Sequence, residues 1–312
     1  MKHLITLENW STAELLEIVD LADRVKAKPE EYHDSMRRKT LMMIFEKPSL
    51  RTRVSFETGA TQMGGHAIFY DLATSPLSSG KENVADLVRV VSRYVDIIMG
   101  RLYEQAHIEE MARLAGVPVI NALTNYEHPC QILADFQTIR EKKGALKGIK
   151  LAYLGDGNNN MTHSLLFGCA KVGMDISVGC PKGEEYEPLD TVVASAKEIA
   201  KETDAKIVLT SDAAEAVVGA DVVYTDSWMS YHIPQHKQDS RIKMFTPYQV
   251  NAALMKRAKK DAIFMNCLPA VRGCEQTAEV IDGPQSVVFD QAENRLHAQK
   301  AVMLLLLASV KK

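Results

Sequence analysis

Short apolar runs alternate with helix-like amphipathic stretches along most of this chain, and this alternation constrains the fold more than any other feature. The runs that predict short buried strands are Leu41–Phe45, His66–Tyr70, Val95–Met99, Val117–Asn121, Ile149–Leu154, Asp175–Val178, Lys206–Thr210, Val222–Thr225, Ile263–Asn266 and Val287–Asp290. Alternating strands and helices imply parallel sheets with right-handed crossovers. The pattern therefore predicts an α/β protein with two lobes, each a parallel sheet flanked by helices, joined near residues 141–148.

The helical stretches are marked by capping and stop signals. Ser11 with Glu14 predicts a capping box before the amphipathic run 15–25. The other stretches that predict helices are Thr52–Met63, Val84–Tyr94, Ile108–Leu114, Pro129–Lys143 and the last, Ala292–Val310. No internal repeat or low-complexity segment interrupts them.

Composition and charge exclude several classes of protein. The 312 residues suffice for two domains, and the 46% hydrophobic and 25% charged fractions are those of a soluble globular protein. The net charge of −3, with both signs interspersed, indicates neither a nucleic-acid nor a membrane surface. The longest apolar run, 301–310, is too short to span a bilayer.

Cysteine usage and the N-terminus indicate the compartment. The five cysteines are odd in number, widely spaced and free of C-x-x-C pairs, which argues against a disulfide framework and against a zinc site. The start of the chain is too polar for a secretory signal. We expect a cytoplasmic protein without a metal or cofactor.

Two short strings carry the chemistry. Ser49-Leu50-Arg51-Thr52-Arg53 follows a strand-like run and opens a helix. A helix N-terminus is an anion site, and arginine matches a phosphate bidentately. His128-Pro129-Cys130-Gln131 supplies an imidazole and an amide that can orient a small polar group. Together the strings predict chemistry on an acyl phosphate.

Further polar residues follow other expected strands. Ligands of open parallel sheets collect outside the carboxyl ends of the strands, so these residues predict one site in the crevice between the lobes. They are Arg101, His128, Asn158–Asn160, Asp226 and Cys267. Each also has a structural alternative, since Asp226 could cap a helix and a free cysteine is usually a small buried hydrophobe. The pair Gly155-x-Gly157 lacks the third glycine of a dinucleotide fingerprint, because residue 160 is asparagine, so a nicotinamide enzyme is not expected.

In this order and separation, the S-x-R-T-R and H-P-x-Q strings resemble those of the aspartate/ornithine carbamoyltransferases. The resemblance covers nearly the whole chain, because three more motifs appear in sequence: Asp226-Ser227-Trp228-Met229-Ser230, Cys267-Leu268-Pro269 and Ala292-Glu293-Asn294-Arg295. It implies that residues 1–140 with a returning helix 291–312 bind carbamoyl phosphate and that 148–290 bind the acceptor amine. It also implies trimers with active sites between subunits.

The resemblance implies a role for each matching residue. Ser49, the Leu50 backbone, Arg51, Thr52 and Arg101 would hold the phosphate, and Thr52, Arg101 and His128 would polarise the carbamoyl oxygen. Gln131 and the carbonyls near Cys267 and Leu268 would hold the carbamoyl amide, while Arg295 would complete the cationic surround. Asp226 and Cys267 would serve the attacking amine, with Asn160, Ser230 and Tyr231 holding the acceptor. Arg101, His128, Asp226 and Cys267 are therefore the expected catalytic residues.

Cys267-Leu268-Pro269 matches the ornithine type of the family, which makes citrulline, but three departures leave alternatives open. The S-M-G loop reads Ser230-Tyr231-His232, the histidine of H-C-L-P is Asn266, and no glutamine lies between Met63 and Glu104. The alternatives are a transferase for putrescine or an N-acylated ornithine, and a non-catalytic paralogue that only binds carbamoyl phosphate. The direction of the reaction, toward biosynthesis or toward carbamoyl phosphate, is not determined by the sequence.

Overall fold

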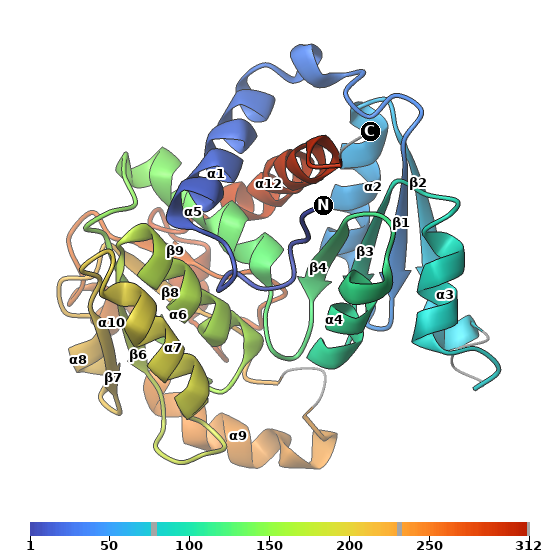
Figure 1. Cartoon of the computed structure of the whole chain (residues 1–312). Coiled ribbons are helices and arrows are strands. Elements are labelled where there is room, and N and C mark those ends of the chain that lie inside the picture. The colour runs from blue at the N-terminus through green and yellow to red at the C-terminus, as the bar shows by residue number, and fades with distance from the viewer. Residues whose placement is uncertain (76–79, 230–232, 311–312) are drawn as a thin grey trace. The chain divides into compact units, whose positions relative to one another are not determined.

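A computed structural model describes residues 1–75, 80–229 and 233–310, and the chain divides into two compact units (Figure 1). The first unit comprises Met1–Gln137 with Glu293–Lys312, and the second comprises Thr138–Ala292. Ser230 and Tyr231, which the sequence predicts to hold the acceptor, lie outside the described residues.

The first unit is built on a four-stranded, fully parallel sheet in the order β2-β1-β3-β4. Its strands are β1 (Thr40–Phe45), β2 (His66–Asp71), β3 (Ile97–Arg101) and β4 (Val119–Leu123). The inner strands β1 and β3 are buried along almost their whole length, which explains their continuous apolar sequence, whereas the outer strand β2 is largely exposed. The four expected strands are confirmed, with bounds shifted by at most two residues.

The expected helices of the first unit form, but α2 starts two residues and α4 three residues before the expected position. The capping box of α1 (Thr12–Ala27) forms, with Ser11 and Glu14 exchanging hydrogen bonds with each other's backbone. The remaining helices are α2 (Leu50–Gln62), α3 (Val84–Val91), α4 (Gln105–Leu114) and α5 (Pro129–Lys143), with 3-10 turns η1 (Pro29–Tyr32) and η2 (Leu72–Thr74). The division between the units falls within α5.

The second unit contains a five-stranded parallel sheet in the order β7-β6-β5-β8-β9. Its strands are β5 (Lys150–Leu154), β6 (Asp175–Gly179), β7 (Ile207–Thr210), β8 (Val222–Thr225) and β9 (Ile263–Met265). Its helices are α6 (Asn160–Val172), α7 (Asp190–Ala200), α8 (Ala213–Ala216), α9 (Gln238–Phe245), α10 (Ala252–Met255) and α11 (Ala278–Ile281), with η3 (Gln235–Lys237) and η4 (Thr246–Tyr248). Trp228 and Phe245 lie in its core.

The expected strand at Val287–Asp290 is wrong, because the last helix α12 (Val288–Ala308) already begins there. Ser286, the residue before this segment, forms a single bridge with Phe264 of β9, and the Val287 amide donates to the Phe264 carbonyl across 3.0 Å. An apolar run of this length does not distinguish a buried strand from the first turn of a buried helix.

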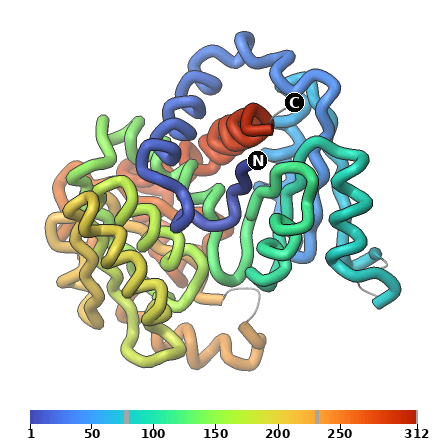
Figure 2. Tube along the Cα trace, viewed as in Figure 1, coloured from blue at the N-terminus to red at the C-terminus, as the bar shows by residue number. Residues whose placement is uncertain are grey.

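Helix α12 begins in the second unit and contributes residues from Glu293 onward to the first. There Lys26 of α1 donates to Asn294 across 2.8 Å, and Gly59 of α2 lies so close to α12 that an added Cβ would be 3.3 Å from Lys300. The Lys2 amide donates to Ser309 Oγ across 3.2 Å, so the start of the chain lies near the end of α12 (Figure 2). Among the described residues, no helix is both long enough and apolar enough to cross a membrane.

Candidate active site

In the first unit the turn after β1 forms a capped helix N-terminus. Ser49 is the N-cap of α2, and its Oγ accepts from the Thr52 amide at 3.3 Å and donates to Thr52 Oγ1 at 3.1 Å. The Leu50 side chain is exposed, so only its backbone can serve the site. Arg53 is directed elsewhere, since it pairs with Glu57 at 3.4 Å and lies over the Phe69 ring. Ser49 and Thr52 therefore lie at the capped start of α2, where the sequence predicts an anion site.

The Thr52 hydroxyl is the shared contact of two arginines from distant parts of the chain. Arg101, at the end of β3, approaches Thr52 Oγ1 to 3.5 Å, and Arg295 of α12 approaches it to 3.4 Å. Arg295 also donates to Gln131 Oε1 at 2.6 Å, and its Nη1 lies 3.5 Å from His128 Nε2. Five residues that the sequence singled out thus meet in one buried cluster, which we call the Thr52 cluster: Thr52, Arg101, His128, Gln131 and Arg295.

Two side chains that the sequence did not single out hold members of the Thr52 cluster in place. Asp135 accepts from Gln131 Nε2 at 2.9 Å, one helical turn further along α5. The Gln299 amide oxygen, in the orientation that satisfies its neighbours, accepts from Arg295 Nε at 3.1 Å and from Nη2 at 2.8 Å. The spacings 131/135 and 295/299 place each pair on one helix face and could have revealed both.

The electrostatics of the Thr52 cluster favour an anion. Burial, with Arg295 and Arg101 nearby, lowers the pKa of His128 well below its ordinary value, so the imidazole is neutral. Buried cations that face one another gain free energy when a negatively charged group binds among them.

Lys47 is a further cation that the sequence did not single out. Its side chain is buried, donates to Asn125 and lies over the Tyr103 ring at 4.4 Å. Burial and the charge of Arg101 lower its pKa to about 8. Its position between β1 and Ser49 was the available signal, but a lysine before a turn is ordinarily solvated.

In the second unit, a thiol and a carboxylate meet after adjacent strands. Cys267 follows β9 and Asp226 follows β8, and the Sγ lies 3.0 Å from Asp226 Oδ1. Both side chains are partly exposed, and Cys267 is a free cysteine. The structure thus joins the two residues that the sequence placed at neighbouring strand ends, and the interpretation of Cys267 as a buried hydrophobe is not supported.

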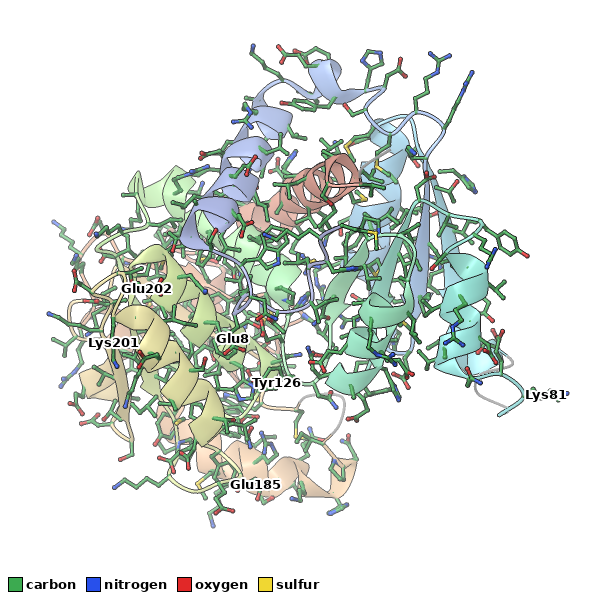
Figure 3. The ribbon with its side chains drawn as sticks, viewed as in Figure 1. Glu8, Lys81, Tyr126, Glu185, Lys201 and Glu202 are labelled. Atoms are coloured by element: carbon green, nitrogen blue, oxygen red, sulfur yellow. The ribbon has the colours of Figure 1, made fainter. Side chains whose placement is uncertain are left out.

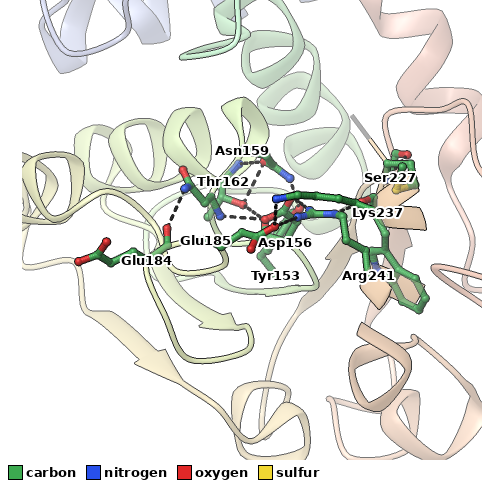
Figure 4. Close-up of polar contacts among 12 residues, drawn as sticks. Tyr153, Asp156, Asn159, Thr162, Glu184, Glu185, Ser227, Lys237 and Arg241 are labelled. Atoms are coloured by element: carbon green, nitrogen blue, oxygen red, sulfur yellow. Dashed lines mark hydrogen bonds and ion pairs between the residues drawn. The ribbon is translucent and has the colours of Figure 1, made fainter. Parts of the chain in front are cut away.

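The turn after β5 leads to Asn160 and is held by a buried network of hydrogen bonds and an ion pair (Figure 4). Asn159 caps α6 by accepting from the Thr162 amide at 2.8 Å, which makes Asn160 the first helical residue. In the same turn Asp156 pairs with the fully buried Arg241 of α9, which also donates to the Trp228 carbonyl at 2.9 Å. Arg241 therefore connects the turn that carries Asn160 to the segment that follows Asp226.

Close packing accounts for the two glycines that resembled half of a nucleotide fingerprint. A Cβ at Gly155, where φ is +128°, would lie 3.1 Å from Trp228 Nε1. A Cβ at Gly157 would lie 2.6 Å from the Tyr186 carbonyl oxygen. Within the described part of the chain, no group of three or more His, Cys, Asp or Glu side chains could hold a metal ion.

The fold and the site define an α/β protein with a buried cationic cluster beside one parallel sheet and a thiol–carboxylate pair at the strand ends of another. Residues 2–141 match the carbamoyl-phosphate-binding domain of aspartate/ornithine carbamoyltransferases, and residues 147–306 match the Asp/Orn-binding domain. The chain belongs to the aspartate/ornithine carbamoyltransferase family.

Its relatives of known name point to one branch of the family. An ornithine carbamoyltransferase of Methanothermobacter thermautotrophicus is 52% identical over 99% of this chain and 100% of that protein. One from Anoxybacillus flavithermus is 51% identical over 98% and 96%. The solved ornithine carbamoyltransferase of Pyrococcus furiosus superimposes with a TM-score of 0.94 at 47% identity, covering 99% of this chain and 98% of that one.

Proposed function

We propose that this protein transfers the carbamoyl group of carbamoyl phosphate to the side-chain amine of L-ornithine, giving citrulline and phosphate. The observation that carries the proposal is the convergence of the Thr52 cluster at the capped N-terminus of α2. A buried site with two guanidinium groups, a helix N-terminus and a neutral imidazole suits an acyl phosphate, which is anionic at one end and a neutral amide at the other.

The donor is held by residues 1–140 with 291–312, which include the whole first unit. Ser49, the backbone of Leu50, Arg51, Thr52 and Arg101 bind the phosphate, and Arg295 adds charge. The neutral His128 carries one N–H, which can donate to the carbamoyl oxygen together with Thr52 and Arg101. Gln131 and the backbone carbonyls of Cys267 and Leu268 hold the carbamoyl NH₂.

In the reaction, the amine nitrogen attacks the carbonyl carbon, and the bond from that carbon to the phosphate oxygen breaks. Negative charge grows first on the carbonyl oxygen and then on the departing phosphate, so preorganised donors aimed at both atoms lower the barrier. The phosphate leaves with the bonding electron pair, and the proton that the amine nitrogen loses is taken up by this departing phosphate. The arginines supply the positive charge that the leaving group requires.

The acceptor is held by residues 148–290, which lie within the second unit. An ordinary primary amine has a pKa near 10.4, so fewer than about one molecule in a thousand is neutral at pH 7. The Asp226–Cys267 pair, with a separation of 3.0 Å, is suited to accept hydrogen bonds from the amine and align it. Asn160, Ser230 and Tyr231 bind the amino-acid end of ornithine.

The relatives favour ornithine over the alternative acceptors. Those at about half identity over nearly the full chain are named ornithine carbamoyltransferase, and one from Pyrococcus furiosus is named anabolic. We therefore place the reaction in arginine metabolism, in amino-acid biosynthesis, and propose a cytoplasmic location, which agrees with the five free cysteines.

We further propose that the active form is a trimer or a multiple of trimers. The outer strand β2 exposes Ile68 and Phe69, and α2 exposes Leu50 and Val54. Because α2 and β2 are neighbours, these exposed apolar side chains support an association surface on this part of the first unit. Mass measurement by light scattering tests this proposal, and a monomer at assay concentration would contradict it.

Steady-state assays with a panel of amines test the proposed activity. We expect a ureido product that depends on both carbamoyl phosphate and L-ornithine, and strong inhibition by a phosphonate that joins the two substrates. A higher kcat/KM with putrescine or N-acetylornithine than with ornithine would show that the acceptor is a different amine, while carbamoyl transfer would still be the reaction. Binding of carbamoyl phosphate without product from any amine would overturn the catalytic assignment.

A further inference from the structure

The segment that ends β9 carries an asparagine, Asn266, where the H-C-L-P motif of the family has histidine. The Asn266 side chain is fully buried and makes two directed hydrogen bonds. Its Oδ1 accepts from the Leu268 amide at 2.7 Å, and its Nδ2 donates to Gln276 Oε1 at 3.1 Å. Both the acceptor and one donor of this amide are therefore used.

Gln276 fixes the orientation of this amide. It is also fully buried, and its Nε2 donates to the Val271 carbonyl at 3.2 Å, which forces its Oε1 toward Asn266. Its own carbonyl accepts from the Gly273 amide at 2.8 Å. The side-chain hydrogen bonds run in one direction, from the Leu268 amide through Asn266 and Gln276 to Val271, and no member can be reversed without leaving a buried polar group unsatisfied.

The backbone of Asn266 is held from the opposite side. Its amide donates to Gln291 Oε1 at 3.0 Å, and Gln291 Nε2 donates to the Tyr224 hydroxyl at 2.9 Å. Gln291 is fully buried as well. Position 266 is thus attached to β8, to the start of α12 and to the 271–276 turn, so it cannot move independently of them.

The residues that follow Asn266 need this support. Leu268 has a φ of +56°, a left-handed conformation that is uncommon for a residue with a branched side chain. The Asn266 Oδ1 compensates for this conformation by binding the Leu268 amide, as in an Asx turn. The Cys267 side chain, between the two, points its Sγ at Asp226 across 3.0 Å.

We propose that Asn266 and Gln276 form a positioning pair that holds the Cys267 thiol against Asp226 and sets the turn at Leu268. Neither amide titrates, so the pair itself gains no charge in the range where a histidine at position 266 would gain a proton. The carboxyl groups beside the pair are Asp226, which the Cys267 thiol contacts, and Glu275, which accepts from the Val271 amide. This inference rests on the proposed function, because the positioned atoms are those assigned to the amine and the carbamoyl group.

Steady-state kinetics of Asn266→Ala, Gln276→Ala and the double variant test the pair. We expect each single variant to lower kcat/KM for ornithine by about tenfold or more, and the double variant to lose little beyond the larger single effect, because coupled residues are not additive. The affinity for carbamoyl phosphate, held mainly by the Thr52 cluster, should stay within about threefold. The matched control is Asn251→Ala, which removes an amide that caps α10 in the same unit by accepting from the amides of Ala253 and Leu254.

The pH dependence of kcat/KM in Asn266→His distinguishes a positioning role from a purely structural one, since a purely structural role would leave this dependence unchanged. A neutral imidazole can accept from the Leu268 amide, but a protonated one cannot, since both of its nitrogens then donate. We expect this variant to lose kcat/KM as the pH falls through about 6.5, relative to the parent protein. A profile parallel to the parent, or equal kinetic losses in Asn251→Ala and Asn266→Ala, would overturn the proposal.

Alkylation of Cys267, followed by peptide mass spectrometry, separates this inference from the proposed function. We expect Asn266→Ala to speed the alkylation of Cys267 by iodoacetamide at least about threefold, because the thiol is no longer held against Asp226. Asn251→Ala should leave that rate unchanged. A faster reaction without turnover of any amine would uphold the positioning pair and reject the carbamoyltransferase, whereas an unchanged rate would reject the pair.

Discussion

Arg295 Nη1 donates to Gln131 Oε1 across 2.6 Å, although 164 positions separate the two residues along the chain. The contact joins the last helix to the helix that follows β4, and Thr52 and His128 lie within 3.5 Å of the same guanidinium group. A guanidinium group held by this many partners is preorganised, so little side-chain entropy is lost when an anion binds.

Replacing Arg295 should therefore weaken the donor half of the reaction. We expect Arg295→Ala to lower kcat/KM for carbamoyl phosphate by about 100-fold or more, because each hydrogen bond from a charged group contributes about 1.5–3 kcal/mol. Arg295→Lys should recover only part of the loss, since an ammonium cannot reproduce the guanidinium fork. Arg113→Ala, which removes an exposed arginine of α4, is the control. Equal activity of Arg295→Ala and Arg113→Ala would contradict the assignment.

The thiol at position 267 should matter for the acceptor. We expect Cys267→Ala to lower kcat/KM for ornithine by about 10-fold to 100-fold, because Asp226 loses a hydrogen-bond partner, and Cys267→Ser to lose less. Cys274→Ala is a matched control, since Cys274 is a free and partly exposed cysteine of the same unit. Steady-state assays at varied ornithine concentration measure the effect, and a Cys267→Ala protein with parental kinetics would refute it.

Lys47 should make the binding of carbamoyl phosphate weaken at alkaline pH. Its pKa, lowered to about 8 by burial and by Arg101, means that it loses its proton and its charge as the pH rises through that value. We expect the dissociation constant of carbamoyl phosphate to rise by up to about tenfold per pH unit above the pKa of the free protein. Lys47→Met should bind more weakly at neutral pH and lack this pH dependence, whereas Lys201→Met, at an exposed lysine (Figure 3), should keep it. An identical pH dependence in Lys47→Met would exclude this role.

Glu127, the residue before His128, should make stability depend on pH. Its side chain is fully buried and accepts from the Leu7 amide at 3.1 Å, and burial raises its pKa from 4.5 to about 8. Glu8 adds negative charge nearby, and burial with Glu127 and Glu8 also raises the pKa of Tyr126 to about 12 (Figure 3).

Between the two pKa values the folded state binds the Glu127 proton and the unfolded state does not. Stability is therefore greatest below pH 4.5 as far as this group is concerned, and it is lost as the pH rises toward 8, by at most about 1.4 kcal/mol per pH unit. We expect Glu127→Gln, which is neutral at every pH, to remove this slope and to be more stable than the parent near pH 8. Urea unfolding at several pH values measures it, with the exposed Glu17→Gln as control. A slope that persists in Glu127→Gln would disprove the prediction.

The buried ion pair of Asp156 and Arg241 should stabilise the folded state only while both members are present. We expect Arg241→Met to cost about 3–5 kcal/mol, because it leaves a buried carboxylate uncompensated, and Arg241→Met with Asp156→Asn to cost less. Lys237→Met, which removes a half-exposed partner of Glu185 (Figures 3 and 4), should change stability by less than about 1 kcal/mol. Denaturant unfolding measures all three, and additive losses in the double variant would contradict the coupling.

Most of the fold followed from periodicity. Nine of the ten expected strands formed, because short apolar runs bounded by turn residues have few alternatives in a sheet that is covered on both faces. The tenth, at Val287–Asp290, became the first turn of α12, where one bridge to β9 was all the pairing available. The local sequence does not show whether an apolar run will find a neighbouring strand with which to pair.

The sequence by itself determined the residue types of the site and their order along the chain. The capped turn at Ser49 and the amides and imidazole of residues 128–131 are local features, so spacing and capping rules reached them. Only the tertiary structure decided that Thr52 is the point where Arg101 and Arg295 meet, that Lys47 is buried beside them, and that Arg53 is turned away. It also decided that Asn266 is fixed between Leu268 and Gln276. The physical reason is that burial and proximity between distant segments set the direction of each side chain and its pKa, and neither is a property of the residue's neighbours in sequence.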